Sequence, residues 1–425
     1  MPTDAATAPS SDLLDLLDPG PRDVGEDMPP STPRPSPHLL DATMFWNPSG
    51  GVHRTISAKC QVLAQQGWRH TVLAPGAHGA GQIDCGGLPL PASGGYRLVL
   101  NRRRVARLIE EARPDIVEAA DPYTMAWAVL DATRRLGVPA VAFCHSNLPA
   151  KAARWAAGTE GTATPRGRWA ARRAGRYLAD LYGRFDLVLA PSRSMTQQLH
   201  DWGVRQALHQ PLGVDCSIFQ PRAFDPVWRS RLSQRLGLPV GTRLLVYCGR
   251  FAAEKNLGVL ADAVRLLGPG HALVALGDGP RPPGGEQVRL LPPEHDSQRL
   301  ARLLASCDAF VHAGDQETFG LAALEAMACG TPVVVSAAAG LGELAQGAGL
   351  TVASLRPREW ADAIAASLAG QSSQLAAAAL DRARTHDRSR VLAQQARRYR
   401  QLMRQQPRTQ TLAVPTEGPM WGLKS

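Results

Sequence analysis

The sequence predicts an α/β protein made of two doubly wound, Rossmann-like domains. A length of 425 residues is enough for two domains of ordinary size. Short apolar runs alternate with longer helical patterns through most of the chain, which is typical of parallel sheets covered by helices on both faces. The composition, 44% hydrophobic and 20% charged, fits a globular chain that buries large cores.

The expected strands and helices follow one another in regular order. Strands are predicted at residues 39–45, 70–74, 115–118, 139–145 and 187–190, and again at 244–248, 272–276, 288–291, 309–312 and 332–336. Helices among the later strands are predicted at residues 256–267, 297–306, 320–328 and 357–368. In such sheets a ligand is expected beyond the carboxyl ends of the strands.

The charge is unevenly distributed along the chain. Residues 1–37 hold seven acids and two arginines, a net charge of −5, and their Pro- and Ser-rich composition predicts disorder. Since the whole chain has a formal net charge of +10, the remainder carries +15. A basic body favours anionic partners, which include nucleotide diphosphates, acidic glycans, anionic lipids and nucleic acid.

Cysteine usage and hydropathy indicate the compartment. The seven cysteines are scattered, without a CxxC pair or a metal-ligand cluster, which predicts reduced thiols. No apolar run approaches the ~18 residues of a membrane-spanning helix, and no signal-peptide pattern opens the chain. We therefore expect a cytoplasmic protein.

Two glutamates, Glu317 and Glu325, flank a turn at Phe319 and Gly320. Glu325 falls within an apolar helical run that begins at Leu321, and a desolvated carboxylate there needs a hydroxyl or a cation as its partner. A ribose diol would meet this need, and the first N–H groups of the helix behind Gly320 offer a site for a diphosphate. The alternative is a surface glutamate on an alanine-rich helix.

A second motif surrounds Gly249. The apolar strand before it leads into a loop that carries two cations, Arg250 and Lys255, and then into a helix. Glycine allows the backbone to approach a ligand closely, and cations at the carboxyl end of a strand suit phosphate.

These motifs occur together in an order that resembles one family, the family-four, retaining nucleotide-sugar glycosyltransferases of the GT-B fold. The resemblance spans residues 47–399 and rests on GRFAAEKN, GDGP, ETFGLAALE, ACGTPVV and PLGVDCSIFQP. It implies a GT-B architecture, in which the two Rossmann-like domains face a cleft. It also implies transfer of a hexose from a nucleotide-diphosphate sugar to a hydroxyl acceptor on a glycan or a lipid-linked molecule.

The resemblance implies a role for each motif residue. Arg250, Lys255 and the helix N-terminus at Gly320 would hold the leaving diphosphate, Glu325 would bind the ribose, and Glu317 would orient the hexose. Retention of the anomeric configuration also follows from the resemblance.

Three further residues belong to the first domain. His145 ends a predicted strand, where a histidine can bond a sugar hydroxyl or move a proton, and the resemblance implies that it faces the donor sugar. Gly50 and Gly51 would lie near the donor phosphates. The alternatives are a buried structural histidine and an ordinary tight turn between a strand and a helix.

An arginine-rich segment at residues 163–185 combines six arginines with Trp169, Tyr177 and Tyr182. A basic helix with aromatic residues suits an anionic membrane surface, which would make the protein peripheral at the inner face of the membrane. Nucleic acid is the rival ligand and is not expected as a partner. The alternative is a solvated arginine face whose aromatic side chains point into the core.

The pattern and the resemblance together divide the chain into six segments. These are the acidic tail at 1–37, an acceptor-side domain at 38–215, an inter-lobe linker at 216–240, a nucleotide-sugar-binding domain at 241–385, a crossover helix at 386–406 and a loose tail at 407–425.

No metal site and no cofactor are predicted, because the sequence has neither a DxD-type pair nor a metal-ligand cluster, so cationic side chains take the place of a metal. The base of the donor stays open, since the segment after GDGP is short and proline-rich where relatives have a longer helical excursion. Two other functions also stay open: a GT-B epimerase or phosphorylase, and a basic non-catalytic protein that binds nucleic acid or membrane.

Overall fold

The computed structural model describes residues 36–47, 50–90, 96–369 and 372–405. Residues from Pro37 onward form one compact unit, and all statements below concern its described part. The predicted acidic tail falls almost entirely outside the described residues, as does the predicted C-terminal tail.

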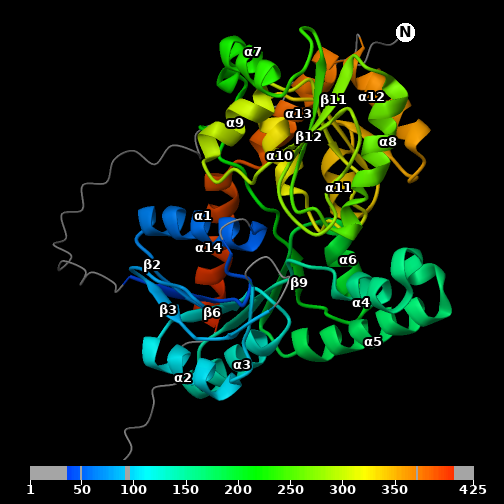
Figure 1. Ribbon diagram of the computed structural model, residues 1–425. Helices are drawn as coiled ribbons and strands as arrows, with labels where there is room; N and C mark the ends of the chain where they lie inside the picture. Colours follow the sequence, from blue (N-terminus) through cyan, green and yellow to red (C-terminus); the bar gives the residue numbers. More distant parts are fainter. Residues whose placement is uncertain (1–35, 48–49, 91–95, 370–371, 406–425) are drawn as a thin grey trace, which may run out of the picture. The chain divides into compact units, whose positions relative to one another are not determined.

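The first sheet has seven strands in the order β3-β2-β1-β6-β7-β8-β9, and all its neighbours pair in parallel (Figure 1). Its strands are β1 His38–Ala42, β2 Arg69–Ala74, β3 Gln82–Asp84, β6 Ile116–Ala119, β7 Ala140–Phe143, β8 Leu187–Ala190 and β9 Ala207–His209. Its helices are α1 Gly51–Gln65, α2 Arg102–Ala112, α3 Thr124–Leu136, α4 Leu148–Ala157, α5 Pro165–Tyr182 and α6 Arg193–Asp201. A small hairpin pairs β4 Leu88–Pro89 with β5 Arg97–Leu98, and a 3₁₀ segment, Gly158–Ala163, joins α4 to α5. We call this sheet and its helices the first lobe.

The second sheet has six parallel strands in the order β12-β11-β10-β13-β14-β15. They are β10 Arg243–Cys248, β11 His271–Leu276, β12 Val288–Leu291, β13 Ala309–His312, β14 Val333–Ser336 and β15 Leu350–Val352. The accompanying helices are α7 Pro226–Arg235, α8 Leu257–Leu267, α9 Ser297–Ala305, α10 Leu321–Ala328, α11 Ala339–Ala345, α12 Pro357–Leu368 and α13 Ser372–Thr385, with 3₁₀ segments at Pro221–Ala223 and Ala253–Lys255. We call this the second lobe.

Both sheets are buried on both faces, as the uninterrupted apolar runs of their strands require. In β10, Leu244 and Val246 join a core with α9, α10 and α11, whereas Leu245 and Tyr247 join a second core with α8 and α12. In the first lobe, Leu40 faces α2 and α3, and Leu39 faces the opposite side with α1. The predicted fold class, two doubly wound α/β domains, is therefore confirmed.

The strand order places one switch point in each sheet. In the first sheet β1 lies between β2 and β6, and in the second β10 lies between β11 and β13. At such points the loops leave in opposite directions and open a crevice for ligands. The loops after β1, β10 and β13 carry most of the residues that the sequence analysis singled out.

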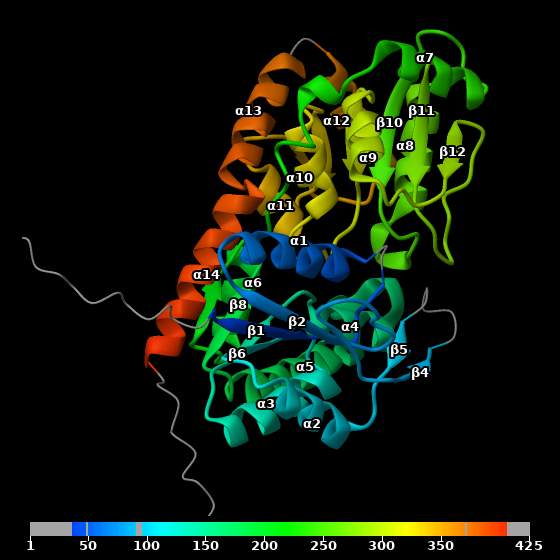
Figure 2. The same ribbon diagram turned by 90° about the vertical axis from the view of Figure 1, so that its left-hand side faces the viewer.

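The chain crosses between the lobes twice, and the two crossings are hydrogen-bonded to each other. Val214 N–H donates to His386 at 3.0 Å, and Arg388 N–H donates to Val214 at 2.8 Å. The second crossing leads into α14 Arg388–Gln405, which runs beside α1 on the first lobe (Figure 2).

Two elements of the first and second lobes differ from the elements predicted from the apolar pattern of the sequence. The strand predicted at residues 39–45 ends at Ala42, because Met44 N–H turns to the buried carboxylate of Asp121 at 2.7 Å. The segment 216–240, predicted as a linker, contains α7, whose Arg229 bonds Asp308 of the second lobe at 2.7 Å. The bounds of the six predicted segments remain predictions.

Candidate active site

The loop after β10 is held by a second glycine loop. Gly277 has a φ of +150°, and a Cβ at this position would lie 2.0 Å from the carbonyl oxygen of Gly249. Phe251 N–H also donates to the carbonyl of Asp278 at 2.5 Å. The GDGP segment therefore fixes the backbone of the Gly249 loop, since only glycine permits this approach.

Arg250 is the exposed cation of this loop. Its side chain is half exposed and pairs with Glu254 at 2.8 Å. Lys255, at the end of the same loop, is much less exposed and forms an ion pair with Glu317. The two predicted phosphate-binding cations thus belong to the same loop but differ in exposure.

Lys255, Glu317 and His312 form a cluster beyond β10 and β13. His312 is buried, accepts a hydrogen bond from Gly314 N–H through Nδ1 at 3.0 Å, and has its Nε2 3.6 Å from Glu317 Oε1. Burial, together with the charge of Lys255, holds the pKa of His312 well below its ordinary value. The neutral imidazole that accepts at Nδ1 carries its proton on Nε2, so it points a donor at Glu317.

Burial lowers the pKa of Lys255 to about 8, and the neighbouring cations Arg250 and Lys151 act in the same direction against the attraction of Glu254. Lys255 is therefore charged at neutral pH and close to losing its proton above it. Asn256, with a φ of +51°, follows and bonds the carbonyl of Ala313 at 3.0 Å, which ties this loop to the end of β13.

The turn before α10 is rigid. Gly320 has a φ of +100°, and a Cβ there would lie 2.4 Å from Leu341. No side chain caps the N-terminus of α10, so its first N–H groups, beginning at Leu321, are open to an anion. The side chain of Phe319 is buried in the second-lobe core, which leaves only its backbone for a ligand.

Glu325 is buried on α10, with 3% of its side chain exposed. One carboxylate oxygen, Oε1, forms an ion pair with Arg54 of α1, and the other, Oε2, has no hydrogen-bond partner among the described residues. Burial raises the pKa of Glu325 and Arg54 opposes this rise. The alternative of a surface glutamate is therefore wrong for Glu325.

The first-lobe residues lie where strands end. Gly50 precedes α1 and Gly51 opens it, and a Cβ on Gly50 would lie 2.9 Å from the hydroxyl of Tyr96. His145 follows β7, stacks on Phe143 at 4.2 Å, and its pKa is lowered to about 3 by burial and by the charge of Lys59. A histidine with this pKa is neutral near pH 7 and can only donate or accept hydrogen bonds.

Further contacts join the first lobe to the loops after β10 and β13. Thr318 Oγ1 donates to the carbonyl of His145 at 3.0 Å. Arg154 of α4 bonds the carbonyl of Ala253 at 3.0 Å and lies 3.3 Å from the carboxylate of Asp315. Residues of both lobes, including Asn147, Ser194, Gln198 and Glu317, line a small cavity here.

Sequence reasoning missed Arg54, Arg154 and His312. Each is a single residue with no motif of its own, and only the fold brings it to the site. For His312 a signal existed, because a histidine that ends an apolar strand just before the glutamate motif lies at the ligand-binding edge of the sheet.

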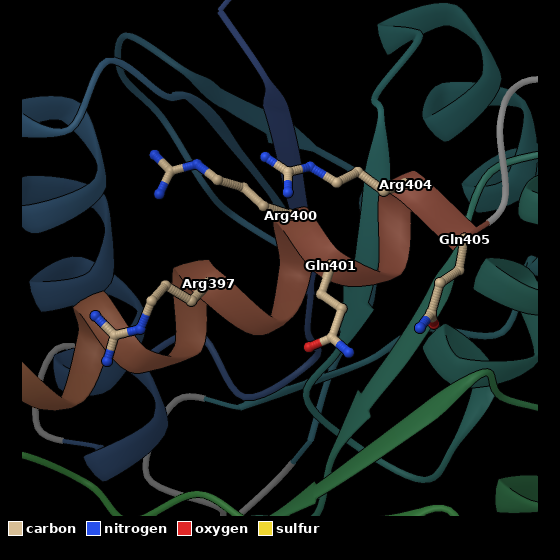
Figure 3. Close-up of a pocket in the computed structure, with 5 residues that line it drawn as sticks. All are labelled: Arg397, Arg400, Gln401, Arg404 and Gln405. Atoms are coloured by element: carbon tan, nitrogen blue, oxygen red, sulfur yellow. The ribbon is translucent and has the colours of Figure 1, made fainter. Parts of the chain in front are cut away.

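Another pocket lies elsewhere, on the surface of α14 (Figure 3). It is lined by Arg397, Arg400, Gln401, Arg404 and Gln405, all from one helix, and contains none of the predicted site residues. It is a basic surface and not part of the candidate site.

Among the described residues, no three histidine, cysteine, aspartate or glutamate side chains are grouped as a metal site would require. No described helix combines the length and the hydropathy needed to cross a membrane.

The buried Glu325, the partly exposed Glu317 and a cationic loop lie at one switch point beside an uncapped helix N-terminus, which is the arrangement expected of the donor site of a GT-B glycosyltransferase. Comparison with known proteins agrees. The profile of Glycosyltransferase Family 4 matches residues 49–217, and that of Glycosyl transferases group 1 matches residues 242–369. A GDP-mannose-dependent α-(1-6)-phosphatidylinositol dimannoside mannosyltransferase of Mycobacterium tuberculosis is 30% identical over 353 residues, which cover 77% of this chain and 86% of the relative.

Other relatives match smaller parts. A D-inositol 3-phosphate glycosyltransferase of Xylanimonas cellulosilytica is 36% identical over 187 residues, 40% of this chain and 45% of the relative. Among solved structures, sucrose-phosphate synthase of Thermosynechococcus elongatus superposes with a TM-score of 0.70 at 20% identity, covering 87% of this chain and all of that one. Anabaena HepE with UDP and glucose gives 0.67 at 20% identity, over 85% and 99% of the two chains. These two structures show the fold alone.

The chain therefore belongs to glycosyltransferase family 4. It is a glycosyltransferase that takes its sugar from a nucleotide sugar, and the predictions of enzyme class and family are confirmed.

Proposed function

We propose that this glycosyltransferase moves a hexose from a nucleotide-diphosphate sugar to a hydroxyl acceptor, with retention of the anomeric configuration and without a metal ion. The observation that carries the proposal is the meeting of Lys255, His312 and Glu317 in the second lobe, where the open N-terminus of α10 leads to the buried Glu325. This set supplies cations and open N–H groups for a diphosphate and carboxylates for sugar hydroxyls.

The leaving diphosphate is bound by Arg250, Lys255 and the first N–H groups of α10. As the bond from the anomeric carbon to the phosphate oxygen breaks, negative charge grows on that oxygen, and fixed cations stabilise it. The acceptor oxygen forms its bond to the same face of the sugar, and its proton passes to the departing phosphate oxygen. Loss of one such cation costs about 10²-fold in rate.

Glu317 orients the hexose through its hydroxyls, and Lys255 and His312 hold Glu317 in place. Glu325 binds the ribose. His145, neutral near pH 7, donates or accepts one hydrogen bond at the sugar. Gly50 and Gly51 let the backbone of the first lobe approach the donor phosphates, and the backbone of Phe319 and Leu321 completes the turn around them.

GDP-mannose is the first donor to test. The M. tuberculosis relative, whose match with this chain covers 86% of the relative's length, is GDP-mannose-dependent. The acceptor of that relative carries phosphatidylinositol, which favours a lipid-linked acceptor here.

A lipid-linked acceptor requires contact with a membrane, and α4 and α5 offer a surface for it. Trp155 is 75% exposed and Trp169 is 65% exposed. The six arginines of the segment at residues 163–185 are exposed, and the guanidinium of Arg173 lies 5.9 Å from the ring centroid of Trp169. Tyr177 and Tyr182 do not belong to this surface, because Tyr177 bonds the carbonyl of Pro122 at 2.7 Å and Tyr182 is buried. A peripheral site on anionic lipid follows from the exposed tryptophans and the positive charge.

Calorimetric titration with GDP-mannose, UDP-glucose and ADP-glucose tests the donor site. We expect one nucleotide series to bind, and to be lost in Arg250→Ala and Glu325→Ala. Arg243→Ala is the matched control, because Arg243 lies at the other end of β10. No binding by any donor, or unchanged binding in both variants, would overturn the proposal.

Two measurements test the finer statements. Activity in excess chelator should remain full, and its loss with recovery on adding a divalent ion would contradict metal independence. Sedimentation with phosphatidylglycerol vesicles should be strong at low salt and weak in a Trp155→Ala, Trp169→Ala variant. Binding to oligonucleotides in place of vesicles would instead support the nucleic-acid alternative.

A further inference from the structure

Arg54 and Glu325 join the two lobes at the carboxylate proposed to bind ribose. Arg54 lies in the first turn of α1, three residues after Gly51, and its side chain is one third exposed. Glu325 lies on α10 of the second lobe and is buried. A contact between residues 271 positions apart is therefore built into the donor site.

The two oxygens of Glu325 are used differently. Oε1 accepts from the Arg54 guanidinium, whereas Oε2 is buried without a hydrogen-bond partner in the described structure. A buried carboxylate oxygen without a hydrogen-bond partner destabilises the folded state, and a hydrogen-bond donor from a ligand would remove this cost. A single hydroxyl of the ligand would satisfy it.

Resting on the proposed function, we infer that Arg54 is a positioning residue for the donor nucleotide. From the opposite lobe it holds Oε1 of Glu325 and keeps the carboxylate charged, so that the unpartnered Oε2 is presented to the ribose as an acceptor.

The surroundings of Glu325 explain why a cation is needed. The titratable side chains that face it among the described residues are Arg54 from α1, Cys248 from β10 and Cys329 from its own helix. Burial raises the pKa of Glu325, and among these groups Arg54 is the one that lowers it. Without Arg54 the carboxyl takes up a proton at higher pH and can present a hydroxyl instead of an acceptor oxygen.

The test compares wild type, Arg54→Ala, Arg54→Lys and the control Arg102→Ala by calorimetry with the nucleotide diphosphate that binds the wild type. Arg102 pairs with Asp131 on the outer surface of the first lobe, so its loss removes a similar arginine–carboxylate pair outside the site. We expect Arg54→Ala to weaken binding by roughly tenfold or more, since a charge-assisted hydrogen bond is lost. Arg54→Lys should recover part of it, and Arg102→Ala should bind as the wild type does.

Two further readouts separate positioning from general damage to the fold. The affinity of Arg54→Ala relative to that of the wild type should decrease as the pH is lowered, since the change in the charge of Lys255 is common to both proteins. A nucleotide that lacks a ribose hydroxyl should bind the wild type more weakly than the parent nucleotide does, and this difference should be smaller for Arg54→Ala. Equal binding by Arg54→Ala and wild type, or the same loss in both proteins when a ribose hydroxyl is removed, would overturn the inference. Absence of any binding by the wild type would instead count against the proposed function.

Discussion

Glu343 of α11 caps the N-terminus of α6 across the two lobes through Ser194 and its neighbour. Its carboxylate accepts from Ser194 N–H at 2.9 Å and from Arg193 N–H at 2.8 Å. These are N–H groups that the helix itself cannot satisfy, and a negative charge is favourable at this end of a helix. A second-lobe carboxylate thus completes a first-lobe helix, next to the cavity that contains Glu317.

Glu343→Ala should therefore loosen the contact between the lobes. Loss of a cap costs about 1–2 kcal/mol. We expect faster hydrogen exchange at the Arg193 and Ser194 amides and a larger radius of gyration by small-angle scattering. Ser192→Ala, which removes the cap that α6 receives within its own lobe, is the control and should leave the radius unchanged. An unchanged radius in Glu343→Ala would show that this cap does not hold the lobes together.

The pKa of Lys255, lowered to about 8, predicts a pH limit on donor use. Below pH 8 the side chain is charged and attracts the diphosphate, and above pH 8 it becomes neutral. We expect kcat/KM for the donor, which reports ionisation in the free enzyme, to fall as the pH rises through about 8.

Lys255→Arg is the control for this limit, because arginine stays charged at these pH values. Its remaining activity, even if small, should show no decline near pH 8. A decline that persists in Lys255→Arg would assign the limit to another group. Ionisation of His145 should not change kcat/KM between pH 5 and 9, because the pKa of this histidine lies near 3.

His312→Ala should act through Glu317 and not through donor affinity. The variant removes the imidazole beside Glu317 and the acceptor of the Gly314 N–H. We expect kcat to fall by roughly tenfold or more, while KM for the donor changes little, since a poorly oriented hexose affects the transition state more than binding. An increase of KM with kcat unchanged would instead place His312 in ground-state donor binding.

Continuous apolar runs predicted the buried strands well. Strands β8 and β13 and helix α12 have the predicted bounds, because their apolar residues coincide with hydrogen-bonded ladder or helix positions. The partly exposed edge strand β12 also has its predicted bounds. The edge strands β3, β9 and β15 went unpredicted. Each has three residues and at most one of them is buried, so none has an apolar run to mark it.

Motifs predicted residues of the candidate site one by one, but not their partners. Lys255 and Glu317 were predicted to bind different parts of the donor, and the structure adds that they pair with each other. The partner of Glu325 had to be a hydroxyl or a cation, and Arg54 supplies the cation from the other lobe. Such contacts depend on how two lobes meet, which local sequence patterns do not encode.

Lys59 forms a buried ion cluster that fixes α1 and α14 to the first sheet. Its ammonium bonds Asp41 of β1 at 2.7 Å and Glu118 of β6 at 2.6 Å, and Tyr399 of α14 donates to Glu118. All of these side chains are buried. Attraction to the ammonium lowers the pKa of Asp41, while burial raises the pKa of Glu118 to about 7.

Lys59→Met should leave the buried Glu118 without a cation and Asp41 with His70 as its partner, and destabilise the protein by about 3–5 kcal/mol at pH 8, measured by urea unfolding. Without Lys59 the folded-state pKa of Glu118 rises further above its unfolded value. The folded state then binds more protons than the unfolded state, so stability decreases as the pH rises between those values. The loss should consequently be smaller at pH 5 than at pH 8. Tyr399→Phe, which removes one hydrogen bond and no charge, should cost only about 1–2 kcal/mol. A loss in Lys59→Met that is the same at both pH values would mean that lost packing, and not unpaired charge, is the cause.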